Sequence, residues 1–340
     1  MEIKQIVFTE PNVAKLLSVE LGEPTDNQVL VKTAFSTISS GTERANLIGD
    51  PNVSPTYKAF SIKDSFPRKV GYCSSGIVCK VGKNVTSLKV GDRVIGTWSK
   101  HASYNLFNEG DVVKLDDSIS LSDAATCFIS TFSLAGLRKT QPEAGESILV
   151  FGLGILGLFS IKLALASGLY PVIAVDPNKN RREMALNMGA DYALDPTEEG
   201  FVQKVKEITN GGANVAIEVT GIGKALDQAL DCMAKFGRVS LLGCTRNSDF
   251  SIDYYRKVHF PGITLVGAHT KARPKFESAP HYFTEIDDLK TVLNLIKGKR
   301  FIVSDLVSEI HSPTECEEVF RRLAFDREFP IGVQFDWSKL

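Results

Sequence analysis

A glycine-rich turn between an apolar segment and a long apolar helix constrains the fold of this chain more than any other feature. Residues 147–151 read Ser-Ile-Leu-Val-Phe, and Gly152-Leu-Gly154-Ile155-Leu156-Gly157 follows directly, ahead of the mostly apolar stretch 158–166. A strand, a G-x-G-x-x-G turn and a helix in this order cradle the pyrophosphate of a dinucleotide. Gly152 permits the tight turn, Gly154 lets the phosphates approach the backbone, and Gly157 lets the helix pack closely on the strand.

The residues around this turn indicate which dinucleotide binds. The helix N-terminus at Ile155 and Leu156 supplies N–H groups and a positive dipole to the phosphates. Asp176 ends the next predicted strand, where a carboxylate accepts hydrogen bonds from the adenosine ribose and repels the 2′-phosphate of NADP. NAD is therefore favoured. Arg181 and Arg182 follow closely and can neutralise a phosphate, although two arginines at a helix start are more often solvated.

Strands and helices alternate through the middle of the chain, after a β-rich first part. The first 115 residues contain short apolar runs such as 28–35 and 76–81, and residues 101–114 resemble a further strand and hairpin, so a partly open barrel is predicted. A helix is expected at 123–139, and helices 286–297 and 313–323 with a closing strand 332–335 form the tail. The central strands are expected at 147–151, 171–175, 214–219, 238–242 and 263–267, as in a parallel sheet covered on both faces.

Length, charge and cysteine usage exclude several classes of protein. The 340 residues exceed one usual core and predict about two domains at roughly 150 residues each. The 39 basic and 40 acidic residues nearly cancel, which favours a small-molecule partner over nucleic acid or an acidic membrane. Six dispersed cysteines without a Cys-x-x-Cys pair indicate neither a disulfide scaffold nor a zinc knuckle and fit a reducing cytoplasm. We expect no signal peptide and no membrane span.

Nearly the whole chain resembles the medium-chain dehydrogenase/reductase superfamily, which includes the zinc-type alcohol and polyol dehydrogenases. The segments that carry the resemblance are 70–85, 89–94, Ala124-Ala125, 142–154 and Met188-Gly-Ala-Asp191. The resemblance implies a GroES-like catalytic domain, expected at 1–122 and 285–340, and a Rossmann domain at 123–284. It also implies an active site in the cleft between the two.

The positions that match the metal ligands of the family depart from its pattern. Ser40 stands where zinc-dependent members have a cysteine, and Tyr72 replaces a histidine, while Cys127 matches the third ligand. Zinc requires three nitrogen, thiolate or carboxylate donors, so no metal is expected, and Cys127 is predicted to be an ordinary buried cysteine. No cysteine lies between Trp98 and Asp111, where the structural zinc lobe would be. The stretch 40–44 also resembles that of the bacteriochlorophyllide dehydrogenases, from which we infer no substrate.

Without a metal, other groups must take the hydroxyl proton and stabilise the developing alkoxide. Thr42 matches the family position that relays the proton, or it caps a helix that begins at Glu43. The Tyr72 phenol can donate to the substrate oxygen, or its ring packs in a strand. Ser40 and Glu43 complete a polar cluster, in which Glu43 is either the base or the partner of an arginine.

Further candidates follow the later strands. His269 follows the strand that lies beneath the nicotinamide in the family, so it either reaches the substrate or is structural. Lys271, Arg273 and Lys275 form a basic loop that is expected to be solvated. Thr220 with Gly221, and Leu242 with Gly243, end successive strands, where ligands gather in open α/β sheets. The family uses these positions for ribose and nicotinamide contacts.

These observations predict an NAD-dependent, zinc-independent oxidoreductase of the α/β class. Its substrate would be a secondary alcohol or ketone of a sugar, cyclitol or other polyol. Two alternatives are an NADPH-dependent quinone or enoyl reductase, which Asp176 disfavours, and a non-catalytic dinucleotide-binding protein. The last Rossmann strand, 263–267, would leave an apolar edge, so a homodimer across this edge, or a homotetramer of such dimers, is expected.

Overall fold

The computed structural model describes residues 1–53, 66–248 and 250–340. The chain divides into two compact units, Met1–Ile129 with Leu289–Leu340 and Ser130–Asp288. The expected boundaries, 122/123 and 284/285, lie a few residues earlier, because the first change of unit falls inside helix α2 (Leu121–Lys139). Within the described ranges, no helix combines the length and the apolar character needed to cross a bilayer.

Unit Ser130–Asp288 is built on a six-stranded parallel sheet in the order β11-β10-β9-β12-β13-β14. The strand order reverses around β9, which pairs with β10 on one side and β12 on the other. The sequence did not predict β11 (Tyr192–Leu194), because its apolar run of three residues is too short to indicate a strand. The other bounds are β9 Ile148–Phe151, β10 Val172–Val175, β12 Ala213–Glu218, β13 Met233–Leu241 and β14 Thr264–Gly267.

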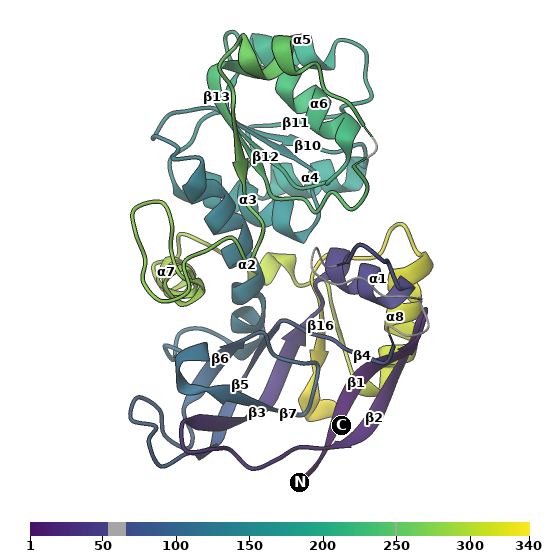
Figure 1. Ribbon diagram of the computed structural model, residues 1–340, viewed down its shortest axis with the longest axis vertical. Coiled ribbons are helices and arrows are strands. Elements are labelled where there is room, and N and C mark those ends of the chain that lie inside the picture. The colour runs from purple at the N-terminus through teal and green to yellow at the C-terminus, as the bar shows by residue number, and fades with distance from the viewer. Residues whose placement is uncertain (54–65, 249) are drawn as a thin grey trace. The chain divides into compact units, whose positions relative to one another are not determined.

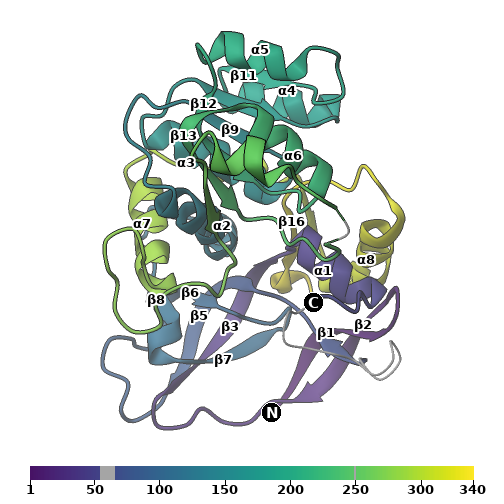
Figure 2. The same cartoon turned by 45° about the horizontal axis from the view of Figure 1, so that its top comes forward.

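Helices cover the faces of this sheet, as Figures 1 and 2 show. One face packs Leu149 and Phe151 of β9 against α5 (Phe201–Ile208) and α6 (Gly223–Asp231) in a buried cluster. Helix α3 (Ile155–Ala166) also packs on β9 and β10, and most of its residues are buried. The unit also contains the second half of α2, α4 (Lys179–Asn187), the single π-helical turn η3 (Tyr255–His259) and the start of α7 (Glu285–Lys297).

The other unit contains two sheets. The larger has the order β15-β16-β3-β5-β6-β8, with β7 also paired to β3, and the smaller has the order β2-β1-β4. The expected hairpin at 101–114 is wrong: β7 pairs with β3 and β8 pairs with β6, because the turn 109–111 leads the chain to a different neighbour. The bounds are β1 Glu2–Glu10, β2 Val13–Glu20, β3 Gln28–Thr37, β4 Arg68–Lys69, β5 Cys73–Val81, β6 Arg93–Thr97, β7 Tyr104–Asn108, β8 Val112–Lys114, β15 Glu309–His311 and β16 Val333–Asp336.

The two ends of the chain share one core in this unit. Phe8 of β1, Leu47 of α1 (Ser40–Ile48), Phe320 of α8 (Cys316–Phe325) and Phe335 of β16 pack in a single buried cluster. Strand β16 pairs antiparallel with β3, so the tail completes a sheet that the first residues begin. The predicted fold class is confirmed: a β-rich GroES-like unit accompanies a doubly wound Rossmann unit.

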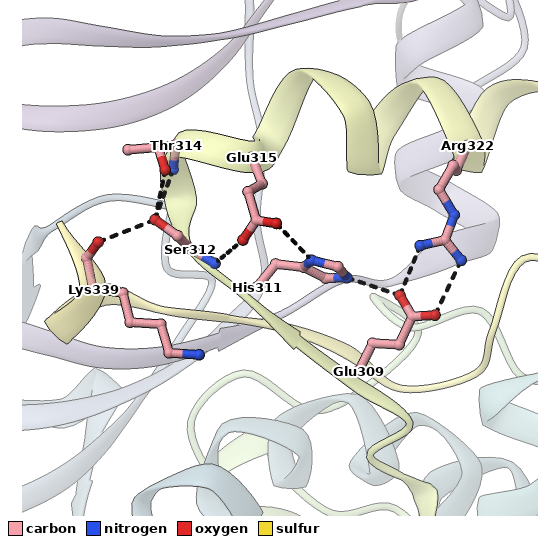
Figure 3. A network of polar contacts seen from close by, with 7 residues as sticks. All are labelled: Glu309, His311, Ser312, Thr314, Glu315, Arg322 and Lys339. Carbon is pink, nitrogen blue, oxygen red and sulfur yellow. Dashed lines mark hydrogen bonds and ion pairs between the residues drawn. The ribbon is translucent and has the colours of Figure 1, made fainter.

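A polar network fixes the returning tail between β15 and α8 (Figure 3). Glu309 accepts hydrogen bonds from both Nη atoms of Arg322, at 2.8 and 3.0 Å, and its Oε2 lies 2.8 Å from Nε2 of His311. Ser312 and Glu315 form a capping box around the short 3₁₀ turn 313–315 that precedes α8. The capping signal explains why the helix predicted from residue 313 begins with that tighter turn.

Candidate functional site

The turn after β9 has the backbone geometry that a phosphate cradle requires. Gly152 adopts a φ of +92°, which favours glycine. A Cβ on Gly157 would lie 1.9 Å from the carbonyl oxygen of Gly152, whereas a Cβ on Gly154 would meet nothing within 4 Å. The fold therefore requires glycine at positions 152 and 157. At position 154 the absence of a side chain leaves open space in front of the backbone.

Helix α3 begins directly after this space. Gly154 is its N-cap in an extended conformation, and the first turn carries no acidic residue. The N–H groups of Ile155, Leu156 and Gly157 belong to that first turn, where backbone donors have no partner within the helix. Together with the helix dipole they form an anion-binding end.

Asp176 follows β10 at the same end of the sheet and is almost fully buried. Its Oδ2 accepts the N–H of Leu153 at 2.8 Å, and its Oδ1 accepts the N–H of Asn178 at 2.8 Å. An ionised carboxylate has about four acceptor sites, so both oxygens keep capacity for a ribose diol. The bond to Leu153 also ties the carboxylate to the glycine turn.

The two arginines of α4 have different surroundings. Arg182 donates to the carbonyl oxygens of Asp176 and Pro177 and forms an ion pair with Asp195 at 2.9 Å. The expectation that it is a solvated surface residue is wrong, because these partners hold its guanidinium against the protein. Arg181 is more exposed, and its Nη1 lies 3.9 Å from Oδ2 of Asp176.

The loops after β12 and β13 pack against each other and against the glycine turn. A Cβ on Gly152 would lie 2.7 Å from Cγ2 of Thr220, and a Cβ on Gly243 would lie 2.3 Å from the nitrogen of Gly221. The structure thus brings Thr220 and Gly243 close to the glycine turn. Leu242, next to Gly243, is buried.

Sequence reasoning missed Glu218, the last residue of β12. It is buried, and its carboxylate accepts the N–H groups of Thr220 and Gly221. Burial raises the pKa of this carboxyl group, although the hydrogen bonds from Thr220 and Gly221 oppose that rise. The sequence did contain a signal for it, because Glu218 is the one charged residue in the predicted strand 214–219.

In the β-rich unit, the first turn of α1 carries Ser40, Thr42 and Glu43. The alternative that Thr42 caps a helix beginning at Glu43 is wrong, because the helix begins at Ser40 and Ser39 is its N-cap. Ser40 and Thr42 are partly exposed, whereas Glu43 is completely buried.

The carboxylate of Glu43 is held inside the unit by two donors. Its Oε1 accepts the N–H of Ser39 at 2.8 Å, and its Oε2 lies 2.9 Å from Nε2 of His101. The expected arginine partner is therefore corrected to a histidine. His101 was not singled out from the sequence, and no motif there signals it. A fully buried carboxylate cannot reach a substrate, so the structure also speaks against Glu43 as a base.

Tyr72 precedes β5 and belongs to a row of three aromatic rings in edge contact. Its ring makes an edge contact with Trp98 at 5.3 Å between centroids, and Trp98 contacts Phe128 at 5.4 Å. Tyr72 is only partly buried, so the packing orients the phenol without enclosing it.

Two cysteines lie near these rings. The Cys127 thiol donates to the carbonyl oxygen of Asp123 at 3.4 Å, and burial raises its pKa well above the usual value. Burial also raises the pKa of Cys73 to about 12. Both thiols are therefore protonated at neutral pH.

His269 follows β14 in the Rossmann unit and is exposed. Burial of part of the ring, with Lys271 and Lys139 nearby, lowers its pKa. Its Nδ1 accepts the N–H of Lys271 at 3.2 Å, which leaves Nε2 as the donor of a neutral ring.

The expected solvated basic loop after His269 is wrong at Arg273. Its side chain is 3% exposed and pairs with Asp288 at 3.2 Å, and it donates to the carbonyl oxygen of Thr131 at 2.6 Å. Arg138 binds the same carboxylate, so Arg273 serves the packing of the unit and not an anionic substrate.

Comparison with known proteins agrees with this architecture. A family model described as zinc-binding dehydrogenase matches residues 156–285. The L-threonine 3-dehydrogenase of Pyrococcus abyssi (strain GE5 / Orsay) is 31% identical over 297 residues, which cover 77% of this chain and 81% of that protein. The D-guloside 3-dehydrogenase of Escherichia coli (strain K12) is 28% identical over 288 residues, covering 80% and 82%.

Solved structures share the fold along nearly the whole chain. A short chain alcohol dehydrogenase of Escherichia coli CFT073, complexed with NADH, superposes with a TM-score of 0.82 at 15% identity and covers 99% of both chains. A protein of Sinorhizobium meliloti 1021 assigned as a zinc-binding dehydrogenase, bound to NADP, gives 0.81 at 19% identity with the same coverage. By its fold and by its similarity to the Pyrococcus enzyme, this chain belongs to the medium-chain dehydrogenase/reductase superfamily.

Proposed function

We propose that the chain is a zinc-independent oxidoreductase that transfers a hydride between NAD(H) and a secondary alcohol or ketone of a sugar, cyclitol or other polyol. The single observation that carries the proposal is the open cradle at Gly154 beside the buried carboxylate of Asp176. Membership of the family supports the coarser assignment, a dehydrogenase that acts on alcohols. The threonine and guloside dehydrogenases among its relatives both act at a CH–OH carbon.

The residues of the Rossmann unit fit a nicotinamide dinucleotide. Backbone N–H groups at Ile155, Leu156 and Gly157 would hold the pyrophosphate, and Asp176 would accept hydrogen bonds from the adenosine ribose. Arg181 flanks that ribose position, while Thr220, Leu242 and Gly243 lie on the other half of the sheet. When bound, the nicotinamide supplies the hydride chemistry. The carboxylate of Asp176 supports NAD over NADP.

The residues that match the family's zinc ligands do not fit a zinc ion. Ser40 and Tyr72 offer hydroxyl groups, and the thiol of Cys127 is protonated and already donates to Asp123. Zinc binds thiolate, imidazole or carboxylate. Among the residues that the structure describes, no group of three or more His, Cys, Asp or Glu side chains is placed to hold a metal ion.

The hydroxyl groups of the β-rich unit would handle the substrate proton. The Tyr72 phenol donates to the substrate oxygen, and the Thr42 hydroxyl passes the proton onward. Ser40 offers a further hydrogen bond to a polyhydroxylated substrate. We keep the neutral His269 as a second candidate donor and no longer propose Glu43, whose carboxylate is committed to His101.

We further propose a homodimer, or a tetramer of such dimers, in a reducing cytoplasm. Strand β14 is the last strand of its sheet, and Thr264 and Leu265 on it are exposed. An unpaired strand edge of this kind favours symmetric pairing. All six cysteines are free thiols, which supports a reducing compartment.

The test combines metal analysis, cofactor titration and a substrate panel. We expect less than stoichiometric zinc, activity on a polyol that survives a strong chelator, and tighter binding of NADH than of NADPH. Asp176→Ala should weaken NADH binding about tenfold or more and relax the bias against NADPH. Glu183→Ala, which removes an exposed carboxylate that pairs with Lys179 on α4 of the same unit, is the matched control and should keep NADH affinity.

Each part of the proposal has an opposing result. One equivalent of zinc that is lost together with activity would overturn zinc independence. NADPH binding as tight as NADH binding, with reduction of a C=C substrate, would identify a quinone or enoyl reductase. NADH binding without turnover of any alcohol or ketone in the panel would identify a non-catalytic dinucleotide-binding protein.

A further inference from the structure

Glu218 occupies the position in the Rossmann sheet where three loops meet. It is the last residue of β12, opposite Phe151 of β9 on one side and Leu241 of β13 on the other. The loop after β9 is the glycine turn, and the loops after β12 and β13 carry Thr220 and Gly243. A side chain at this point can influence all three loops.

The carboxylate of Glu218 organises the loop after β12. It accepts the N–H of Thr220 at 2.7 Å, the N–H of Gly221 at 3.1 Å and the hydroxyl of Thr220. The Thr220 oxygen in turn accepts the N–H of Ile222 at 3.0 Å, at the N-cap of α6. Three donors converge on one buried acceptor, so the backbone from 220 to 222 is fixed by a single side chain.

The backbone of the same residue organises the loop after β13. Its carbonyl oxygen accepts the N–H of Leu242 at 3.0 Å and the N–H of Gly243 at 2.7 Å. Gly221 adopts a φ of +67°, and a Cβ there would lie 2.6 Å from the carbonyl oxygen of Cys244. The two loops therefore lie in direct contact, and a shift of one moves the other.

We propose that Glu218 is a positioning residue for the nicotinamide half of the bound dinucleotide. This inference rests on the proposed function. A doubly wound sheet binds the two halves of a dinucleotide on opposite sides of the point where the strand order reverses. Asp176 follows β10 on one side of β9, so the loops after β12 and β13, on the other side, hold the nicotinamide half. Thr220 packed against Gly152 links these loops to the pyrophosphate turn.

The test uses Glu218→Gln in the full-length protein and compares two ligands, NADH and 5′-AMP. Glutamine keeps the size of the side chain, but it removes the negative charge, and its Nε2 donor replaces the oxygen that lies 3.1 Å from the N–H of Gly221. We expect NADH to bind about tenfold more weakly, while AMP, which occupies only the adenosine half, binds as tightly as before. The melting temperature serves as a check on folding.

Glu146→Gln is the matched control. Glu146 pairs with Arg238 at the opposite end of the strands, so its loss should leave the ratio of NADH to AMP affinity unchanged. If Glu218→Gln fails to fold, Thr220→Val replaces it, because it removes one of the three donors to the carboxylate. Thr220→Val should weaken NADH binding with AMP binding unchanged.

The outcomes separate this inference from the proposed function. Wild-type protein that binds neither NADH nor AMP would overturn the proposed function itself. Wild-type protein that binds both, with a variant that loses both affinities in proportion or neither, would overturn the positioning role. Selective loss of NADH affinity would support it.

Discussion

His101 and Glu43 form a completely buried pair in the β-rich unit, with Nε2 of the histidine 2.9 Å from Oε2 of the carboxylate. Glu43 lies in the first turn of α1, and His101 precedes β7. The same histidine places Nδ1 2.7 Å from Oγ of Ser36, which accepts the indole N–H of Trp337 at 2.9 Å. The pair therefore connects the helix that carries Thr42 to strand β3 and to the end of the chain.

This network gives the first prediction. Glu43→Gln should lower the free energy of unfolding of the protein by about 3 kcal/mol, because it leaves a buried histidine facing an amide in place of a carboxylate. Urea unfolding followed by circular dichroism measures the loss. Glu318→Gln, which breaks the exposed pair with Arg321, is the control and should cost less than about 1 kcal/mol. Equal losses in the two variants would contradict a supporting role for the buried pair.

The sequence predicted the Rossmann unit better than the β-rich unit, for a physical reason. Parallel strands buried on both faces appear as uninterrupted apolar runs, and the glycine turn fixes where one strand ends and its helix begins. Strand β11 has only three residues, too short a run to indicate a strand, and it was missed. In the β-rich unit, β7 pairs with β3, which is distant in the sequence, and β8 pairs with β6 on the other side of β7 along the chain. Local patterns suggested a hairpin between β7 and β8 instead.

Polar partners were the least predictable part of the candidate site. The glycines and Asp176 follow from local spacing. The structure leaves open space at Gly154 and joins Leu153 to Asp176 by a hydrogen bond, and the role of these residues in dinucleotide binding stays a prediction. The partner of Glu43 is a histidine far along the chain, and only the tertiary fold brings the two together. The burial of Arg273 likewise depends on Asp288, which lies on a later helix.

The glycine turn gives a second prediction with an internal control. Gly154→Ala should fold with unchanged stability, since its Cβ meets no protein atom within 4 Å, but it should block NADH binding by filling the phosphate space. Gly157→Ala should destabilise the fold by several kcal/mol, because its Cβ overlaps the carbonyl oxygen of Gly152. Thermal unfolding with and without NADH distinguishes the two. Full NADH affinity in Gly154→Ala would contradict pyrophosphate binding at the glycine turn.

The exposed edge of the Rossmann sheet gives a third prediction. Leu265 on β14 is 38% exposed, and a symmetric contact across β14 would bring two copies of it together. Leu265→Lys should convert the proposed dimer to a monomer, because like charges would then meet at that contact. Light scattering at micromolar concentration measures the change. Leu186→Lys on α4 of the same unit is the control, and a wild-type monomer would defeat the proposed assembly.

The network at the returning tail gives a fourth prediction, on pH. Hydrogen bonds from Arg322 hold the pKa of Glu309 below its usual value, so the folded state binds a proton at this group less readily than the unfolded state. The stabilisation is complete above the unfolded pKa and is lost as the pH falls through the folded pKa. Glu309→Gln should thus cost about 1 kcal/mol at pH 7.

The pH dependence of that cost is the decisive measurement. In a His311→Gln background, which removes the titratable group 2.8 Å from Glu309, the difference in unfolding free energy caused by Glu309→Gln should stay constant from pH 7 to pH 5. It should shrink below about pH 4.5, where the unfolded carboxyl group is protonated. Glu317→Gln, on the exposed side of α8, should show no such change. A constant difference down to pH 3.5 would mean that the Arg322 contact does not alter the titration of Glu309.

The last prediction concerns the two hydroxyl groups that would replace the metal. Tyr72→Phe keeps the ring that contacts Trp98 and removes only the phenol oxygen. Thr42→Val keeps the branched shape in the first turn of α1 and removes only the hydroxyl. If both groups handle the substrate proton, each variant should lower turnover about 10²- to 10³-fold at saturating NAD, with the melting temperature of the wild type.

A catalytic role and a structural role of Tyr72 predict different turnover for the same variants. A purely structural tyrosine would keep its turnover when the oxygen is removed, because the ring packing remains. A full rate in Tyr72→Phe would therefore remove Tyr72 from the mechanism and make His269, with its neutral ring and Nε2 donor, the next residue to test. In that case we expect His269→Ala to lower turnover, as Tyr72→Phe did not, and to leave NADH affinity unchanged.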